Sequence, residues 1–273
     1  MKTKTLSLLM SAASACCGLG VFISCSPKEA CATSVEMVTD SLVADIDMGH
    51  FAIAIQHPAD TTSALAQALA EYASEALGGV YQGEYTSPHA VMAFYHSQTI
   101  KDWQPDYQQL KEVSDADPKF YWNAAISKVA DTPRFLTVAY TCESYQGGAH
   151  GLSLHFGITL RKSDCRRMGW EILRNSNDEK VQELMRQGLK EYFNVKTDDE
   201  LKNLLFNENY IYTMPLPQCP PLFTADGIQF VYNPYEIAPY AAGRPTFVIP
   251  YEKLSDNLTV TAQRLCGIIT TTH

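Results

Sequence analysis

The stretch "YTCESYQGGAHGLSLHF" (residues 140–156) contains a glycine-rich turn between two segments of alternating character, and this turn decides the fold class. Three of the five residues from Gly147 to Gly151 are glycines, which adopt positive φ angles at little steric cost. After the turn, alternate residues are apolar and share one face: Leu152, Leu154, Phe156, Ile158 and Leu160. The sequence therefore predicts an antiparallel hairpin that carries a histidine, His150, in its turn.

Strand-like and helix-like segments surround this hairpin without a regular β-α-β alternation. Such a mixture is typical of the α+β class. We expect two small α+β domains, at residues 41–161 and 162–255, with mainly antiparallel sheets and helices packed on them. Asp226-Gly227 predicts a second hairpin turn. The other expected strands are 41–58, 120–130, 134–145, 150–161 and 245–251. The expected helices are 63–79, 88–113 with a kink or break at Pro105, one from Ser176 or Asn177, and 198–205.

The N-terminus has the pattern of a targeting signal. Lys2 and Lys4 precede an uncharged run that ends in "FISC" (residues 22–25), and a polar stretch follows. This order predicts a lipoprotein signal peptide at 1–25, with Cys25 as the lipidated residue. Phe22 departs from the leucine that usually stands three positions before the cysteine. An uncleaved membrane anchor and cleavage after Ala32 remain alternatives.

The signal peptide sets the expected location and the order of the remaining segments. Residues 26–40 are expected to be a tether and residues 256–273 a C-terminal tail. We expect the protein to be exported and lipid-anchored in the cell envelope, at the outer membrane or the periplasmic face of a Gram-negative cell. Its contact with the membrane would run through the lipid.

Charge and cysteine content exclude some classes of function. Removal of the signal takes away two lysines and no acid, so the formal charge falls from −9 to −11. Such an acidic body is a poor ligand for nucleic acid. After cleavage, Cys31, Cys142, Cys165, Cys219 and Cys266 remain beside Cys25, and we expect one or two disulfides among these five. The chain has no C-x-x-C pair, which argues against zinc and thioredoxin-type redox sites.

Three stretches together carry a resemblance to a known family. They are "YQGGAHG" (145–151), "FTADGIQFVYNPYEIAPYAAG" (223–243) and "FVIPYEKL" (247–254). In this order and spacing they resemble the paired extracytoplasmic domains of unknown function of the RsiV type. These domains occur in a lysozyme-sensing anti-sigma factor of Gram-positive bacteria and in many bacterial lipoproteins. The resemblance implies an α+β fold and direct binding of lysozyme. Only four residues precede the apolar run, so no cytoplasmic sigma-binding segment is expected.

The candidate binding residues are Tyr145, His150, Tyr235, Glu236 and Tyr240. His150 is either a functional group or a turn histidine whose ring bonds to a backbone group or to Glu143. Glu236 is the best placed acid, and its alternative is a carboxylate that stabilises its loop. The tyrosines form either a sugar- or protein-binding platform or part of the core. No catalytic motif and no suitably spaced histidines occur, so no catalytic residue, metal or cofactor is expected.

Three functional hypotheses follow. The first is a non-enzymatic binding lipoprotein whose partner is lysozyme or another cationic wall-targeting protein, because opposite charge speeds encounter. The second is a peptidoglycan- or glycan-binding module or hydrolase, which would be favoured if Glu236 and His150 lined one pocket. The third is a structural role in an envelope complex, which a large exposed apolar patch would support.

Overall fold

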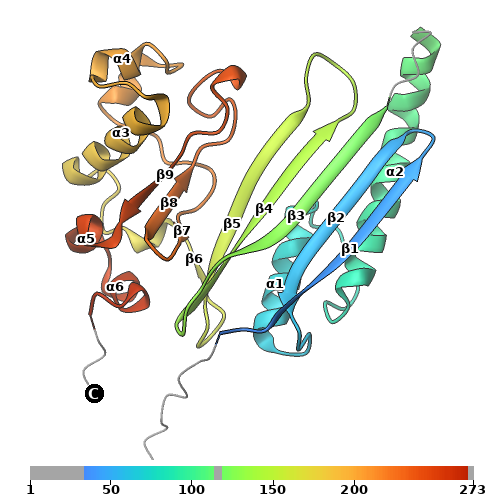
Figure 1. The fold of residues 1–273 in the computed structure, drawn as a ribbon, viewed down its shortest axis with the longest axis horizontal. Helices are drawn as coiled ribbons and strands as arrows, with labels where there is room; N and C mark the ends of the chain where they lie inside the picture. The colour runs from blue at the N-terminus through green and yellow to red at the C-terminus, as the bar shows by residue number, and fades with distance from the viewer. Residues whose placement is uncertain (1–33, 114–118, 270–273) are drawn as a thin grey trace, which may run out of the picture. The chain divides into compact units, whose positions relative to one another are not determined.

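The computed structural model describes residues 34–113 and 119–269, and its larger sheet has six strands (Figure 1). Their spatial order follows the sequence, β1-β2-β3-β4-β5-β6. All neighbours pair antiparallel except β2 and β3, which are parallel. The strands are β1 (Met37–Ile46), β2 (Gly49–Pro58), β3 (Phe120–Asp131), β4 (Phe135–Tyr145), β5 (Leu152–Arg161) and β6 (Arg167–Met168).

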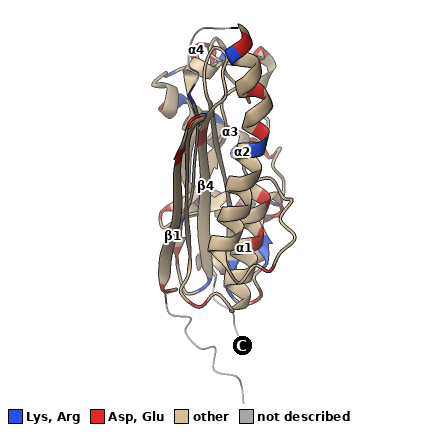
Figure 2. Cartoon of the chain, turned by 90° about the vertical axis from the view of Figure 1, so that its right-hand side faces the viewer, with Lys and Arg blue, Asp and Glu red and all other residues tan. Residues whose placement is uncertain are grey.

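Two helices join the parallel pair and cover one face of this sheet. They are α1 (Ala64–Ala76) and α2 (Pro88–Val113), and Figure 2 shows both on the same side of the strands. The side chain of Ser63 caps α1, and α2 continues through Pro105. The helices bury alternate strand residues, among them Phe51, Ile53 and Val138, in the first hydrophobic core.

The C-terminal part contains a second sheet and the remaining helices. Helix α3 (Glu179–Phe193) packs so closely on β9 (Thr246–Pro250) that a Cβ at Gly188 would lie 2.2 Å from the ring of Phe247. The strands are β7 (Leu222–Phe223), β8 (Gly227–Val231) and β9 (Thr246–Pro250). The α-helices are α3 (Glu179–Phe193), α4 (Asp198–Lys202), α5 (Tyr251–Leu254) and α6 (Val260–Cys266), and the 3-10 helices are η1 (Trp170–Ile172), η2 (Glu208–Ile211), η3 (Tyr240–Ala242) and η4 (Ser255–Asn257).

The two sheets have separate cores that meet at a small third cluster. Cys219, Leu222 and Val231 form this cluster, and Phe156 of β5 packs against it. Beside it, the hydroxyl of Thr159 accepts a hydrogen bond from the amide of Phe223 (3.0 Å). Residues 32–273 accordingly form one compact unit. The predicted α+β class is confirmed, while the division into two domains stays a prediction.

Element boundaries differ from the sequence-based expectations at several places. The expected strand 41–58 is two antiparallel strands, β1 and β2, with a turn at Asp47 and Met48 between them. Strand β1 begins at Met37, inside the expected tether, because it pairs along its whole length with β2. Strand β6 carries the larger sheet past residue 161. The expected C-terminal tail contains α6, because Ala262 and Leu265 are buried in the second core. The expected signal peptide and Cys25 lie outside the described residues.

The expected disulfides are not found among the described cysteines. Cys142, Cys165, Cys219 and Cys266 are all free thiols. Cys142 lies in the first core and Cys219 in the third cluster. Burial raises the pKa of the Cys219 thiol to about 12, so the thiolate that would react is suppressed. Cys31 lies outside the described residues.

In the part of the chain that the structure describes, none of the helices is both long and apolar enough to cross a membrane.

Candidate functional site

The β4–β5 turn is held in shape by Tyr145. Its hydroxyl donates to the carbonyl of Gly148 (3.0 Å), and its ring stacks on Tyr121 with the centroids 6.1 Å apart. Gly147 and Gly148 have φ angles of +95° and +93°, as the glycine-rich sequence predicts. Tyr145 therefore positions the turn that carries His150.

A second loop, residues 233–243, docks on the free edge of β5. The side chain of Asn233 accepts from the backbone amide of His155 (2.6 Å) and donates to the His155 carbonyl (3.0 Å). This pair of bonds imitates a strand partner. Asn233 is buried, so the contact is shielded from water. The loop is therefore fixed against the strand that follows the turn.

Glu236 stabilises this loop from within. One carboxylate oxygen accepts the amide of Asn233 and the other accepts the amide of Gln218, both at 3.0 Å. Backbone amides thus bind both carboxylate oxygens of Glu236. The structure brings Glu236 into the loop's own hydrogen bonding and not beside His150, which agrees with the loop-stabilising alternative.

The two loops bring three of the predicted residues together. The ring of His150 stacks on Tyr240 with the centroids 4.0 Å apart. Its Nε2 lies 3.1 Å from the hydroxyl of Tyr235, and its Nδ1 lies 2.8 Å from the Gly151 carbonyl. A carbonyl only accepts, so in the neutral ring Nδ1 carries the proton and Nε2 accepts from Tyr235. The alternative in which a backbone group binds His150 is therefore realised, together with a tyrosine.

Phe206 completes what we call the aromatic cluster: His150, Phe206, Tyr235 and Tyr240. Its ring is parallel to that of Tyr235, with the centroids 6.4 Å apart. Phe206 and Tyr235 are 53% and 55% exposed, so the cluster presents ring surface to solvent. Sequence reasoning missed Phe206, and the only local signal was an aromatic residue directly after a short helix. The amide of Phe206 donates to the carbonyl of Ile237 (2.9 Å), and this tertiary contact places Phe206 in the cluster.

Tyr235 adopts a backbone conformation that is unusual for its type. Its φ angle is +71°, in the left-handed region that favours glycine. Such strain persists only where the surroundings over-determine it, and it concentrates at functional sites. Here the neighbouring hydrogen bonds of Asn233 and Glu236 hold the loop, and the ring of Tyr235 is directed to the His150 side chain.

The contacts of the aromatic cluster are those of a binding surface. Neither ring nitrogen of His150 contacts a carboxylate, and Glu236 is occupied elsewhere. Over residues 34–113 and 119–269, no group of three or more His, Cys, Asp or Glu side chains could hold a metal ion. The aromatic cluster can stack and hydrogen-bond with a partner through the faces of its rings.

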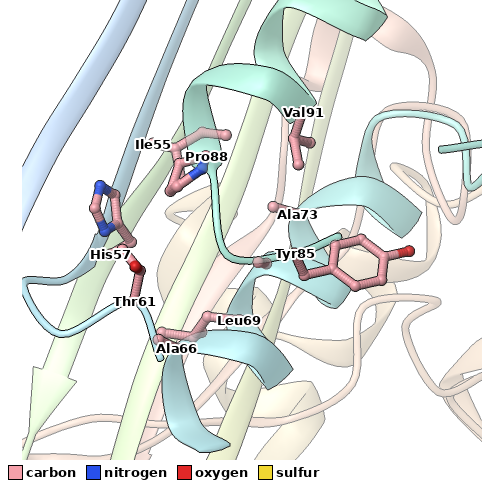
Figure 3. A pocket seen from close by; sticks show the side chains of 10 residues that line it. Ile55, His57, Thr61, Ala66, Leu69, Ala73, Tyr85, Pro88 and Val91 are labelled. Carbon is pink, nitrogen blue, oxygen red and sulfur yellow. The ribbon is translucent and has the colours of Figure 1, made fainter. Parts of the chain in front are cut away.

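Two other hollows are less suited to a functional role. Figure 3 shows an apolar cavity of about 10 Å³ beside α1 and the start of α2, lined by Leu69 and Val91 among others. It has room for about one water and too few polar partners to hold it. At its edge, His57 is bound to Asp40 (3.2 Å). A wider polar hollow lies between α3 and α4, where Asp198 is already paired with Lys190 (2.8 Å).

Comparisons with known proteins agree with this architecture. A protein of the DUF3298 family from Bacteroides fragilis has a TM-score of 0.70 at 21% identity, over 85% of this chain and 97% of that chain. A second, from Pseudomonas aeruginosa, has a TM-score of 0.58 at 13% identity, over 85% of this chain and 98% of that chain. No curated protein matches. Residues 171–252 match the family described as protein of unknown function (DUF3298).

Proposed function

We propose that the protein is an exported lipoprotein, anchored at Cys25, with a non-catalytic binding role in the cell envelope. Its partner is lysozyme or another cationic wall-targeting protein, and the contact surface is the aromatic cluster. The resemblance to RsiV-type domains supports the class of partner, and the "FISC" sequence supports the anchor.

The observation that carries the proposal is the aromatic cluster itself. Tyrosine and other aromatic side chains are enriched at the energetic centres of protein interfaces. Here the rings are already stacked and bonded, so little conformational entropy would be lost on binding. The two loops that carry them are fixed by Asn233 and Tyr145 before any partner arrives.

Charge supports a cationic partner. The formal charge of the chain is −9 at neutral pH. Opposite charges raise the rate of encounter, and this contribution weakens as salt screens it. We therefore expect association with a basic protein to depend on ionic strength, while the aromatic contacts set the dissociation rate.

The test is calorimetry of residues 26–273 with hen lysozyme at about 50 and 200 mM salt. This segment retains the whole compact unit, which begins at residue 32. We expect the affinity to fall as salt rises. Tyr235→Ala and Phe206→Ala should each lower the affinity at least tenfold, which is about 1.4 kcal/mol. Tyr212→Ala is the matched control, because Tyr212 is 73% exposed and lies outside the aromatic cluster. No heat at tens of micromolar protein, or equal losses for all three variants, would refute the proposal.

A glycan ligand is the second candidate, because the face-to-face stack of His150 and Tyr240 offers a flat platform for a sugar ring. A titration with soluble peptidoglycan fragments separates the two. Tyr240-dependent binding of fragments without binding of lysozyme would favour the glycan and rule out the protein partner.

A further inference from the structure

The face of the larger sheet opposite α1 and α2 carries two rows of small and polar side chains. Partner residues in register lie on the same face, so each row can be followed across five strands. One row is Val43, Ala52, Asn123, Glu143 and Ser153, and the other is Ser41, Ala54, Ala125, Thr141 and His155.

The row residues on β1 to β4 line a groove of about 370 Å³. Ala52, Ala54 and Ala125 give it a floor of small apolar side chains. Asn123, Thr141 and Glu143 supply polar groups along it. Arg244, from the C-terminal part of the chain, closes the end at β5, where it contacts Ser153. A groove of this volume suits a small ligand rather than a whole domain.

Arg244 is a cation that has no counterion among residues 34–113 and 119–269. Its guanidinium donates only to the hydroxyl of Ser153 and the carbonyl of Leu154, both at a long 3.4 Å. Throughout the described residues, no carboxylate lies within the 4.0 Å of an ion pair with it. By contrast, Arg161 and Arg167 pair with Asp164 and Glu75. Arginine binds carboxylates through two parallel hydrogen bonds, and Arg244 has this capacity unused.

His155 lies beside Arg244, and its ring is uncharged. Burial, and then the charge of Arg244, lower the pKa of His155 to about 4, so its ring is neutral at physiological pH. Its Nε2 is buried without a hydrogen-bond partner. On the same face, Glu143 is exposed and makes no ion pair with any described residue. The groove therefore presents an unpaired cation and an unpaired anion.

We propose that this groove binds the free C-terminus of a short peptide with small side chains. Arg244 pairs with the terminal carboxylate, and the alanine floor accepts the side chains. Glu143, which lies between Arg244 and the alanine floor, accepts a backbone N–H of the peptide, and Asn123 and Thr141 bond to the same backbone. The volume corresponds to roughly two or three small residues. This inference concerns a different surface from the aromatic cluster and does not depend on the proposed function.

The test is a calorimetric and NMR titration of residues 26–273 with trialanine. We expect binding, with shifts of the amides around Arg244 and Ala54. Trialanine amide, which lacks the terminal carboxylate, should bind at least tenfold more weakly. Equal binding of the acid and the amide would overturn the role of Arg244, and no shift at about 10 mM peptide would overturn the site, since that affinity is weaker than about −3 kcal/mol.

Variants locate the site independently of the peptide chemistry. Arg244→Gln should lower affinity at least tenfold, Arg244→Lys should retain part of it, and Ala54→Leu should block the floor. Arg166→Gln, on an arginine paired with Glu171 outside the groove, is the matched control. Loss of binding in the Arg166 variant, or full binding in the Ala54 variant, would contradict the proposal.

Discussion

His150 and His155 lie five residues apart in one hairpin, and their surroundings differ in kind. His150 is exposed, and both of its nitrogens have hydrogen-bond partners. His155 is half-buried, its Nε2 has no partner, and Arg244 lies beside it. Protonation of His155 would therefore place a second positive charge beside that of Arg244 in a poorly hydrated site. This difference has a measurable consequence for stability.

We predict that His155→Leu makes the protein less sensitive to acid. The pKa of His155 is lowered from 6.5 to about 4 in the folded state, so between these values the unfolded chain binds the proton more readily. Wild-type stability should fall as pH drops through this window, and the leucine variant should lose less. We expect about 1–2 kcal/mol of difference at pH 4.5 relative to pH 7.5, after allowance for solvent screening. Urea unfolding at the two pH values measures it, and an equal loss in both proteins would contradict it.

The residues of the site were predictable only where local sequence marked them. His150 stands in a glycine turn, and Tyr235 and Tyr240 stand in a proline-punctuated loop. A loop-stabilising role for Glu236 was one of the sequence-based alternatives, but its partner could not be named, because the amide of Gln218 lies 18 residues away. Phe206 and Arg244 acquire their roles from contacts with other segments, which no local pattern contains.

At the scale of elements, periodicity predicted the long helices and the β4–β5 and β7–β8 hairpins. The β1–β2 hairpin was not predicted, because residues 41–58 were expected as one strand. The expected helix 88–113 is α2, and the glycine pair after residue 77 ends α1 as expected. The parallel pairing of β2 with β3 was not predicted, because it joins strands that two helices separate. Helix α6 was missed because seven residues give too short a pattern. Such short helices form through packing rather than through their own propensity.

The packing of α6 gives the second prediction. Leu265 is 4% exposed and lies in the second core, whereas Ile268, just past the helix, is 39% exposed. Leu265→Ala should lower the free energy of unfolding by about 2–4 kcal/mol, and Ile268→Ala by less than about 1 kcal/mol. Urea denaturation followed by circular dichroism measures both. Equal small effects would mean that the C-terminal segment behaves as the tail that the sequence suggested.

At the scale of the whole molecule, the question is whether the two cores unfold together. The sequence suggests two domains, while the structure joins the sheets through the third cluster and the bond from Phe223 to Thr159. Thr159 also bonds to the hydroxyl of Thr137 (2.9 Å), so one side chain links β4, β5 and β7. All three of these residues are fully buried, with 0% exposure. A hydrogen bond there should couple the stability of both cores.

We predict that Thr159→Val destabilises both cores to the same extent. The substitution keeps the shape but leaves the buried amide of Phe223 without an acceptor, at a cost of about 1–3 kcal/mol. Native-state hydrogen exchange of Val138 in β4 and Met185 in α3 measures the opening free energy of each core. Equal losses at the two amides would show one cooperative unit, whereas a loss confined to Met185 would show that the C-terminal part unfolds as a separate domain. Thr246→Val is a matched control, because the hydroxyl of Thr246 bonds only to the nearby Arg244 carbonyl.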